Sequence, residues 1–199
     1  MSIEDPVLIL PVTDAAALTR IGDAPAVAHC VGTARTVVIG CPTALVGEIE
    51  IALSGVDARI VGLDGTPSRA DCLRAALAQL DSAVTSVLVH DVRYPLAPVD
   101  LRDRVVAELL SGAAVVIPAL AMVDSVKKVD PAGSVIGTVD RETLRSLQFP
   151  RGFRRDVLAE HGDGVGPAAT FVAGDADAFA LDLPGDAALA EAILARRSG

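Results

Sequence analysis

Five short runs rich in β-branched residues recur along the chain, and segments with helical spacing lie between them. The runs cover residues 7–10, 36–39, 58–61, 86–90 and 114–117. This alternation is typical of βαβ units, in which parallel strands are joined by helical crossovers. The sequence therefore predicts a three-layer α/β fold with a mostly parallel sheet covered by helices.

Four segments are predicted to be helices from the spacing of their apolar residues. In one of them Leu101, Val105 and Leu109 recur behind Pro98, a residue favoured near helix starts. The other predicted helices cover residues 43–54, 69–80 and 186–197. Each lies between or after predicted strands, as the α/β pattern requires.

Length and composition indicate a single folded domain, residues 1–199. Of these residues 51% are hydrophobic and 22% are charged, which excludes a mainly disordered chain. The sequence has no Trp and one Tyr, so aliphatic side chains must fill the core. Cys30, Cys41 and Cys72 show no Cys-x-x-Cys spacing, which argues against disulfides and a thiol zinc site.

Net charge and hydropathy exclude two classes of partner. The chain carries 17 Lys and Arg against 26 Asp and Glu, a net charge of −9 that repels nucleic acid. The longest uncharged run, residues 109–123, is interrupted by Pro118 and is too short for a membrane span. The start, residues 1–5, is acidic where a secretory signal is basic, so we expect a cytoplasmic protein.

A β-hairpin arm is predicted at residues 124–139. Two strand-like segments, 125–129 and 134–139, flank the turn sequence Asp130-Pro131-Ala132-Gly133. Few large apolar residues occur in the arm, and an isolated hairpin is marginally stable. We therefore expect the arm to pack on a partner subunit.

Two polar segments follow predicted strands, where open parallel sheets bind ligands. The strand at 86–90 leads into Asp91, Arg93 and Tyr94, and the strand at 58–61 leads into a turn with Gly65 and then Arg69. Backbone N–H groups at such a helix start bind anions. The alternative interpretation is structural: Asp91 only begins a turn before a proline, and the second segment is only a loop and helix entry.

The remaining candidates are weaker. His29 is interpreted as a partly buried helix residue and His161 as a cation at a helix end. The sequence Gly162-Asp163-Gly164 has no preceding strand, so it is no dinucleotide fingerprint. No spacing of His, Cys and Asp indicates a zinc centre.

Several segments occur in a characteristic order and spacing. They are Val87-Leu88-Val89-His90-Asp91, Asp124-Ser125-Val126-Lys127, Gly137-Thr138-Val139-Asp140-Arg141 with Leu144 and Gln148, and Val172-Ala173-Gly174-Asp175 followed by Pro184 and Ala190-Glu191. In this order and spacing they resemble the methylerythritol-phosphate cytidylyltransferase family over nearly the whole chain. The resemblance implies a nucleotidyltransferase-type, Rossmann-like fold. It also implies a homodimer with crossed arms that uses magnesium to join CTP to 2-C-methyl-D-erythritol 4-phosphate.

The resemblance also implies roles for individual residues. Asp91 resembles the acidic residue near the ribose, the metal and the substrate phosphate, and Gly65 and Arg69 resemble the turn and arginine after the base-binding strand. On the arm, Ser125 resembles the hydroxyl that touches the methylerythritol, and Lys127 ends the arm motif. Arg141 resembles the arginine that reaches the substrate phosphate of the other subunit, a role suited to a forked cation. Cys72 replaces a serine.

The sequence departs from the family pattern where the family has glycines and cationic residues. The family has a glycine-rich loop, an arginine and a Pro-Lys pair after its first strand, because phosphoryl transfer requires donors around the developing charge. Here Asp14 and Ala16 replace loop glycines, Leu18 stands near the arginine, and the Pro-Lys pair is deleted. Further on, Tyr94 takes an arginine position and Ala180 a lysine position.

Three functional hypotheses follow. In the first, the chain is a divergent family member with weak or no CTP transfer, and Asp91, Ser125, Lys127 and Arg141 form a residual site for a phosphorylated ligand, or the chain binds a protein partner. In the second, it is an active CTP-dependent enzyme in isoprenoid synthesis, with Arg20 or Arg93 replacing lost cations. The third is a purely structural dimer.

Overall fold

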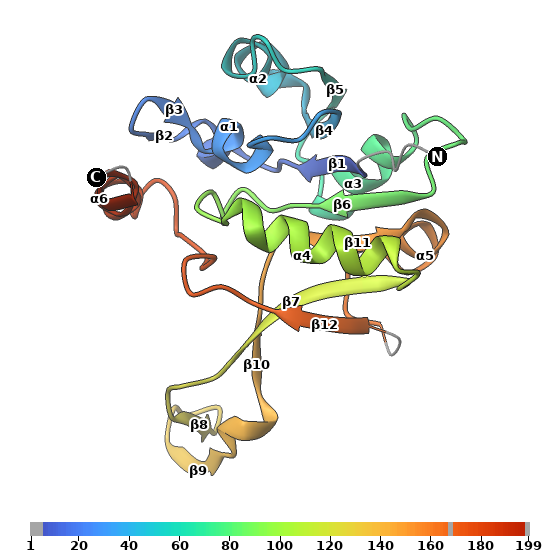
Figure 1. Cartoon of the computed structure of the whole chain (residues 1–199). Helices are drawn as coiled ribbons and strands as arrows, with labels where there is room; N and C mark the ends of the chain where they lie inside the picture. The colour runs from blue at the N-terminus through green and yellow to red at the C-terminus, as the bar shows by residue number, and fades with distance from the viewer. Residues whose placement is uncertain (1–5, 167–168, 198–199) are drawn as a thin grey trace.

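The computed structural model describes residues 6–166 and 169–197 (Figure 1). The acidic start of the chain, on which the expected location rests, lies outside these residues. Within them, no helix is both long enough and apolar enough to cross a membrane.

An eight-stranded sheet forms the centre of the molecule, in the order β10-β7-β11-β6-β1-β4-β5, with β12 paired to β7. Its strands are β1 (Val7–Pro11), β4 (Val37–Pro42), β5 (Ala58–Leu63), β6 (Ser86–Val89), β7 (Val115–Ala121), β10 (Arg145–Leu147), β11 (Arg151–Arg154) and β12 (Ala169–Ala173). Strand β1 pairs in parallel with β4 and β6, β4 with β5, and β7 with β12. The predicted mostly parallel α/β sheet is confirmed.

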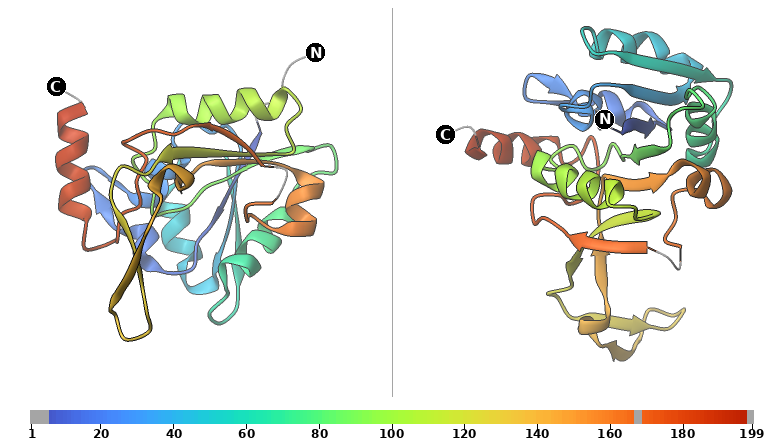
Figure 2. Two further views of the ribbon diagram at one scale, coloured as in Figure 1. Left: turned by 90° about the horizontal axis from the view of Figure 1, so that it is seen from below. Right: turned by 45° about the vertical axis from the view of Figure 1, so that its right-hand side comes forward.

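Helices cover both faces of this sheet (Figure 1, Figure 2). They are α1 (Ala26–Val31), α2 (Val46–Ala52), α3 (Arg69–Leu77), α4 (Val99–Leu110), α5 (Arg155–His161) and α6 (Ala187–Arg197), with 3-10 turns η1 (Ala15–Leu18), η2 (Thr43–Leu45) and η3 (Arg141–Thr143). A small hairpin, β2 (Arg20–Ile21) with β3 (Ala24–Pro25), lies between η1 and α1. All four predicted helices are present, although the one expected at 43–54 begins with η2.

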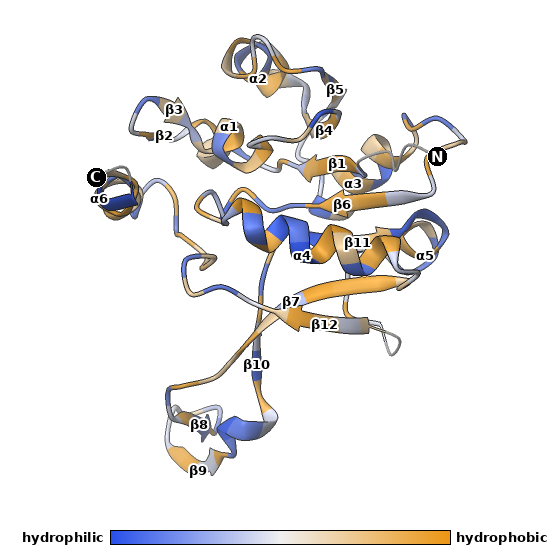
Figure 3. Cartoon of the chain, in the orientation of Figure 1, coloured by the Kyte–Doolittle hydropathy of each residue, from blue (hydrophilic) through white to orange (hydrophobic). Residues whose placement is uncertain are grey.

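Alternation along β1 separates the two hydrophobic layers. Leu8 and Leu10 pack with residues of α1, α2 and α4, whereas Val7 and Ile9 pack with residues of α3 and α5. Successive side chains of a strand point to opposite faces, so a five-residue strand that is buried throughout needs helices on both sides. Figure 3 shows β7 as hydrophobic over most of its length, as expected for a covered strand.

A third, smaller cluster lies beyond the carboxyl ends of β1 and β6, where α6 packs beside the β2–β3 hairpin (Figure 2). Ile21, Leu181 and Ala190 are fully or almost fully buried there. The backbone N–H of Gly22 donates to Glu191 Oε1 at 3.0 Å. These contacts hold α6 and the segment before it against the β2–β3 hairpin.

The predicted arm is confirmed as a hairpin that extends away from the body (Figure 1). Strand β8 (Val126–Val129) pairs antiparallel with β9 (Val135–Val139). In the turn, Asp130 accepts bonds from the backbone N–H groups of Ala132 and Ser134. The Asp130 side chain therefore stabilises the turn by bonding backbone N–H groups, as aspartate does in many loops.

Candidate functional site

A cavity of about 420 Å³ lies at the carboxyl ends of β1 and β6. Its walls are the loop after β1, the β6 tip, the start of α3 and the segment before α6. The lining residues are Pro11, Thr13, Asp14, Ala16, Arg69, Asp91, Val92, Arg93, Leu181, Asp182 and Leu183. This is the edge at which the sequence predicts ligand binding.

Asp91 is the buried centre of the cavity wall, with a side chain that is 4% exposed. Its Oδ1 accepts hydrogen bonds from the backbone N–H and the Nε–H of Arg93, at 2.9 and 3.0 Å. Its Oδ2 accepts from Arg93 Nη2 at 2.9 Å and from Arg69 Nη1 at 3.1 Å. Two guanidiniums therefore share one carboxylate.

These bonds explain the protonation state of the pair. Burial raises the pKa of Asp91, but the hydrogen bonds from Arg93 and the charge of Arg69 outweigh it and leave that pKa below its ordinary value. The bonds to Asp91 likewise raise the pKa of Arg93. Asp91 is therefore anionic and Arg93 is cationic at neutral pH.

Arg69 links the cavity to the loop after α5. Its Nε donates to Asp163 Oδ2 at 3.0 Å, and its Nη2 donates to the His90 carbonyl at 3.2 Å. Arg151 donates to the Asp163 carbonyl at 2.9 Å and lies over the Phe149 ring, 4.1 Å from its centroid. Asp163 thus neutralises part of the charge that Arg69 brings to the site.

His90 supports Asp91 from behind the cavity. The backbone N–H of Asp91 donates to His90 Nδ1 at 2.8 Å, and the Cys30 thiol donates to the Asp91 carbonyl at 3.6 Å. Burial lowers the pKa of His90 to about 4, so the imidazole is neutral at pH 7. A neutral imidazole fixes the β6 tip without adding charge.

In the loop after β1, a side chain of the loop accepts a hydrogen bond from the loop's own backbone. Asp14 is the N-cap of η1, and its Oδ1 accepts a bond from the Ala16 N–H at 2.8 Å. Its Oδ2 accepts from the Thr13 hydroxyl at 3.1 Å. A carboxylate of the chain therefore occupies an N–H of the kind that a phosphate-binding loop offers to its ligand.

Of the two arginines considered as replacement cations, only Arg93 lines the cavity. Arg20 is exposed, and its Nη2 donates to the carbonyls of Gly22 and Asp23 at 3.4 and 2.8 Å. These bonds hold Arg20 on the β2–β3 hairpin.

The predicted base-binding turn lies beside the cavity rather than in its wall. Gly65 has a φ of +75°, a left-handed conformation that favours glycine, and it is not among the cavity-lining residues. Ser68 then begins α3 with a capping box, because its side chain accepts from the Asp71 N–H while Asp71 accepts from the Ser68 N–H. The Cys72 thiol donates to the Val12 carbonyl at 3.2 Å, which ties α3 to the first loop.

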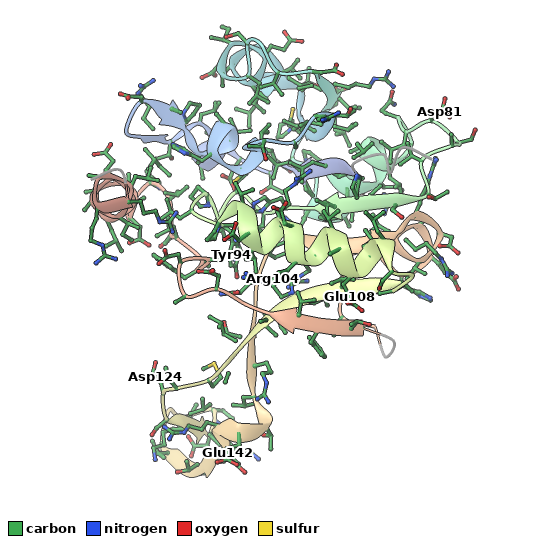
Figure 4. All side chains as sticks on the ribbon, viewed as in Figure 1. Asp81, Tyr94, Arg104, Glu108, Asp124 and Glu142 are labelled. Atoms are coloured by element: carbon green, nitrogen blue, oxygen red, sulfur yellow. The ribbon has the colours of Figure 1, made fainter. Side chains whose placement is uncertain are left out.

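The arm residues lie apart from this cavity within one chain. Ser125, Lys127 and Arg141 are exposed. Lys127 donates to the Thr138 hydroxyl at 2.8 Å, and Arg141 donates to the Val123 carbonyl at 2.7 Å. Figure 4 shows Asp124 and Glu142 on the arm, away from Tyr94 in the body. The structure therefore brings Asp91 and Arg69 together but leaves the three arm residues outside their site.

The site does not fit a magnesium ion as it stands. Both oxygens of Asp91 already accept two hydrogen bonds each. In the part of the chain that the structure describes, no group of three or more His, Cys, Asp or Glu side chains is placed to hold a metal. Magnesium usually keeps several waters and is held by one or two carboxylates with substrate phosphates, so the fit depends on Asp91, whose oxygens are already occupied.

Sequence reasoning missed two carboxylates at the site. Asp163 meets Arg69 across 94 positions of the chain, and Asp182 lines the cavity from the segment before α6. Neither residue follows a strand that the sequence predicts. No local pattern could have placed them here.

Comparisons with known proteins place the chain in one family. The model of the 2-C-methyl-D-erythritol 4-phosphate cytidylyltransferase family matches residues 26–196. A protein of that name from Frankia casuarinae is 36% identical over 90% of this chain and 74% of its own, and one from Saccharopolyspora erythraea is 34% identical over 84% and 82%.

Solved structures agree with the sequence comparisons. The crystal structure of 2-C-methyl-D-erythritol 4-phosphate cytidylyltransferase from Thermus thermophilus has a TM-score of 0.76 and 25% identity, and the match covers 97% of this chain and 100% of that one. The 4-diphosphocytidyl-2C-methyl-D-erythritol synthase structure from Anaerococcus prevotii has a TM-score of 0.79 at 19% identity, which supports the fold.

Proposed function

The chain belongs to the 2-C-methyl-D-erythritol 4-phosphate cytidylyltransferase family, and we propose that it is a divergent member with weak or no cytidylyl transfer and a residual site for a phosphate ester. It keeps the anionic Asp91 and the arm of the family, but it has lost cations that act on the nucleotide.

The loop after β1 is the observation that carries this proposal. Asp14 stands where the family needs glycine, and its carboxylate caps the Ala16 N–H. A triphosphate would meet a negative charge there and would find that donor already bonded. Losing one preorganised donor costs about 2.7 to 4 kcal/mol of transition-state stabilisation.

The charges around the cavity support the same conclusion. Asp14, Asp91 and Asp182 line it, against only two guanidiniums, those of Arg69 and Arg93, among its described lining residues. Charge repulsion disfavours a multiply charged nucleotide tail in such a cavity. The family model also begins its match at Ala26, after β1 and this loop. This start of the match supports a divergence in the segment that precedes α1.

The residual site would form between two copies of the chain. In this proposal the arm of one copy brings Ser125, Lys127 and Arg141 toward Asp91 of the other, as a homodimer with crossed arms would do. The exposure of all three side chains supports it. A phosphate ester would then meet arm cations that are absent from the cavity of a single chain.

Pyrophosphate release tests the proposal. The protein is incubated with CTP, magnesium and 2-C-methyl-D-erythritol 4-phosphate, beside the Frankia casuarinae relative as a positive control. Because several donors are missing together, we expect turnover at least about a thousand-fold below that of the relative. Turnover comparable to the relative would overturn the proposal.

Binding of the phosphate ester separates the residual site from a purely structural dimer. We expect Arg141→Ala to weaken binding of 2-C-methyl-D-erythritol 4-phosphate about tenfold while self-association persists. Unchanged binding would remove Arg141 from the site, and no binding by the unaltered protein would favour the structural dimer.

The second candidate function is active cytidylyl transfer, with Arg93 as a replacement cation. Identity of 36% to the Frankia casuarinae cytidylyltransferase favours it, as does the position of Arg93 in the cavity wall. The same pyrophosphate measurement decides between the two candidates.

A further inference from the structure

We propose that Asp91 anchors Arg93 instead of binding a metal ion, so that the cavity takes a phosphate monoester through Arg93 without a divalent cation. This inference rests on the proposed phosphate-ester site and specifies the chemistry of that site. It assigns Arg93, which the resemblance leaves without a role, as the ligand-contacting cation.

The first step is that the Asp91 carboxylate is saturated. A carboxylate offers about four lone-pair positions, and Asp91 accepts four hydrogen bonds from N–H groups. Three of them come from Arg93, including a side-on fork from its Nε and Nη2. A metal ion could reach an oxygen only by displacing an arginine.

The second step is that neighbouring groups oppose a dication. A metal on Asp91 would lie against the guanidiniums of both Arg69 and Arg93, which are already within 3.1 and 2.9 Å of Oδ2. Asp14 is engaged by Ala16 and Thr13. Asp182 also lines the cavity, but its carboxylate frees no oxygen of Asp91 for a metal ion.

The third step is that Arg93 has a donor edge available. Its side chain is 60% exposed, and its Nη1 has no hydrogen-bond partner among the residues that the structure describes. Arg69 is less available, since its side chain is 30% exposed and each of its three nitrogens donates to Asp91, Asp163 or His90. An anion in this cavity would therefore meet Arg93 first.

Within the cavity of one chain, the free edge of the Arg93 guanidinium limits the class of ligand. One guanidinium edge pairs with one phosphate group. Without a metal ion to screen its charges, a triphosphate would also face Asp14 and Asp182. The geometry therefore favours a compact phosphate monoester over a nucleoside triphosphate.

The metal is tested first, by a readout that does not depend on turnover. Mn²⁺ is titrated into the protein and its free fraction is measured by electron paramagnetic resonance. We expect no site that depends on Asp91, so the spectra of the unaltered protein and Asp91→Asn should agree. Stoichiometric Mn²⁺ binding that Asp91→Asn abolishes would overturn the inference.

The ligand is tested by calorimetry with 2-C-methyl-D-erythritol 4-phosphate, in EDTA and in magnesium. We expect the two dissociation constants to agree within about twofold, and Arg93→Ala to weaken binding about tenfold or more in both buffers. Arg93→Lys should fall between, because it keeps the charge and loses the fork. Arg20→Ala is the matched control, an exposed arginine bonded to hairpin carbonyls, and should bind normally.

Failure of this inference is distinct from failure of the proposed function. Binding that EDTA abolishes, or that Arg93→Ala leaves intact, overturns only the metal-free Arg93 site. Pyrophosphate release at the rate of the relative overturns the proposed loss of transfer. Absence of phosphate-ester binding in both buffers overturns both the residual site and its chemistry.

Discussion

His90 and Asp91 are neighbours in the chain whose pKa values both lie below their ordinary ones, for different reasons. Burial lowers the pKa of His90 to about 4 because it disfavours the charged imidazolium. Burial acts in the opposite direction on Asp91, where the bonds from Arg93 and the charge of Arg69 prevail. The pair therefore holds a neutral base beside an anion.

At this residue scale we predict a loss of stability in mild acid. The folded protein keeps His90 neutral down to a pKa of about 4, whereas the unfolded chain takes up a proton near pH 6.5. Below pH 6.5 the unfolded state therefore binds more protons, and the free energy of unfolding falls as the pH falls toward 4. The full window corresponds to about 3 kcal/mol, measurable by urea unfolding.

A variant separates His90 from other titrating groups. His90→Asn retains an acceptor for the Asp91 N–H but cannot be protonated, so its stability should change much less between pH 6.5 and 4. His161→Asn, at the exposed end of α5, is the matched control and should keep the slope of the unaltered protein. An equal slope in His90→Asn would show that another group causes the loss.

At the scale of elements, the start of α3 decides where Arg69 stands. The capping box of Ser68 and Asp71 fixes the first turn, and Arg69 is the next residue after the cap. A side-chain cap satisfies backbone N–H groups that have no partner inside the helix. The cap thereby aims the Arg69 guanidinium at Asp91 and Asp163.

Ser68→Ala is predicted to destabilise the protein by about 1 kcal/mol, because it removes the bond to the Asp71 N–H. Urea unfolding measures the change. Ser111→Ala is the control, since its hydroxyl donates to the Glu108 carbonyl at the opposite end of a helix, α4, and caps no N–H group. Equal losses in the two variants would contradict a specific role for the cap.

At the scale of the whole molecule, the arm is set apart from the layered body. Figure 1 shows it projecting beyond the sheet, and its apolar side chains are largely exposed. Val135 is 64% exposed and Ile136 is 58% exposed. Exposed apolar patches of this kind mark association surfaces.

We predict that Ile136→Asp shifts the protein from dimer to monomer, because a charge would be buried at the proposed arm interface. Sedimentation velocity measures the change. Ile51→Asp is the matched control, as Ile51 is 76% exposed on α2, and should leave association unchanged. A dimer that survives Ile136→Asp would place the interface elsewhere, and a monomeric unaltered protein would contradict the crossed-arm proposal.

Several elements were predictable because their signal is local. The spacing of Leu101, Val105 and Leu109 gives α4 its buried side, and all three residues are buried. Strand β11 was missed, although it lies between β6 and β7 in the sheet, because Arg151 and Arg154 bound a four-residue segment without an apolar period. Its position in the sheet comes from antiparallel pairing with β6 and β7, which no pattern in its own sequence indicates.

By itself, the sequence determined the α/β class, the arm, the family resemblance and the presence of Asp14 in the first loop, because each of these depends on residue types at fixed spacing. Only the tertiary structure decided how the site charges are shared. Asp163 reaches Arg69 from 94 positions away, Arg20 turns back onto its own hairpin, and Arg93 closes on Asp91. Electrostatic pairing depends on distance in space and on burial, which chain order does not specify.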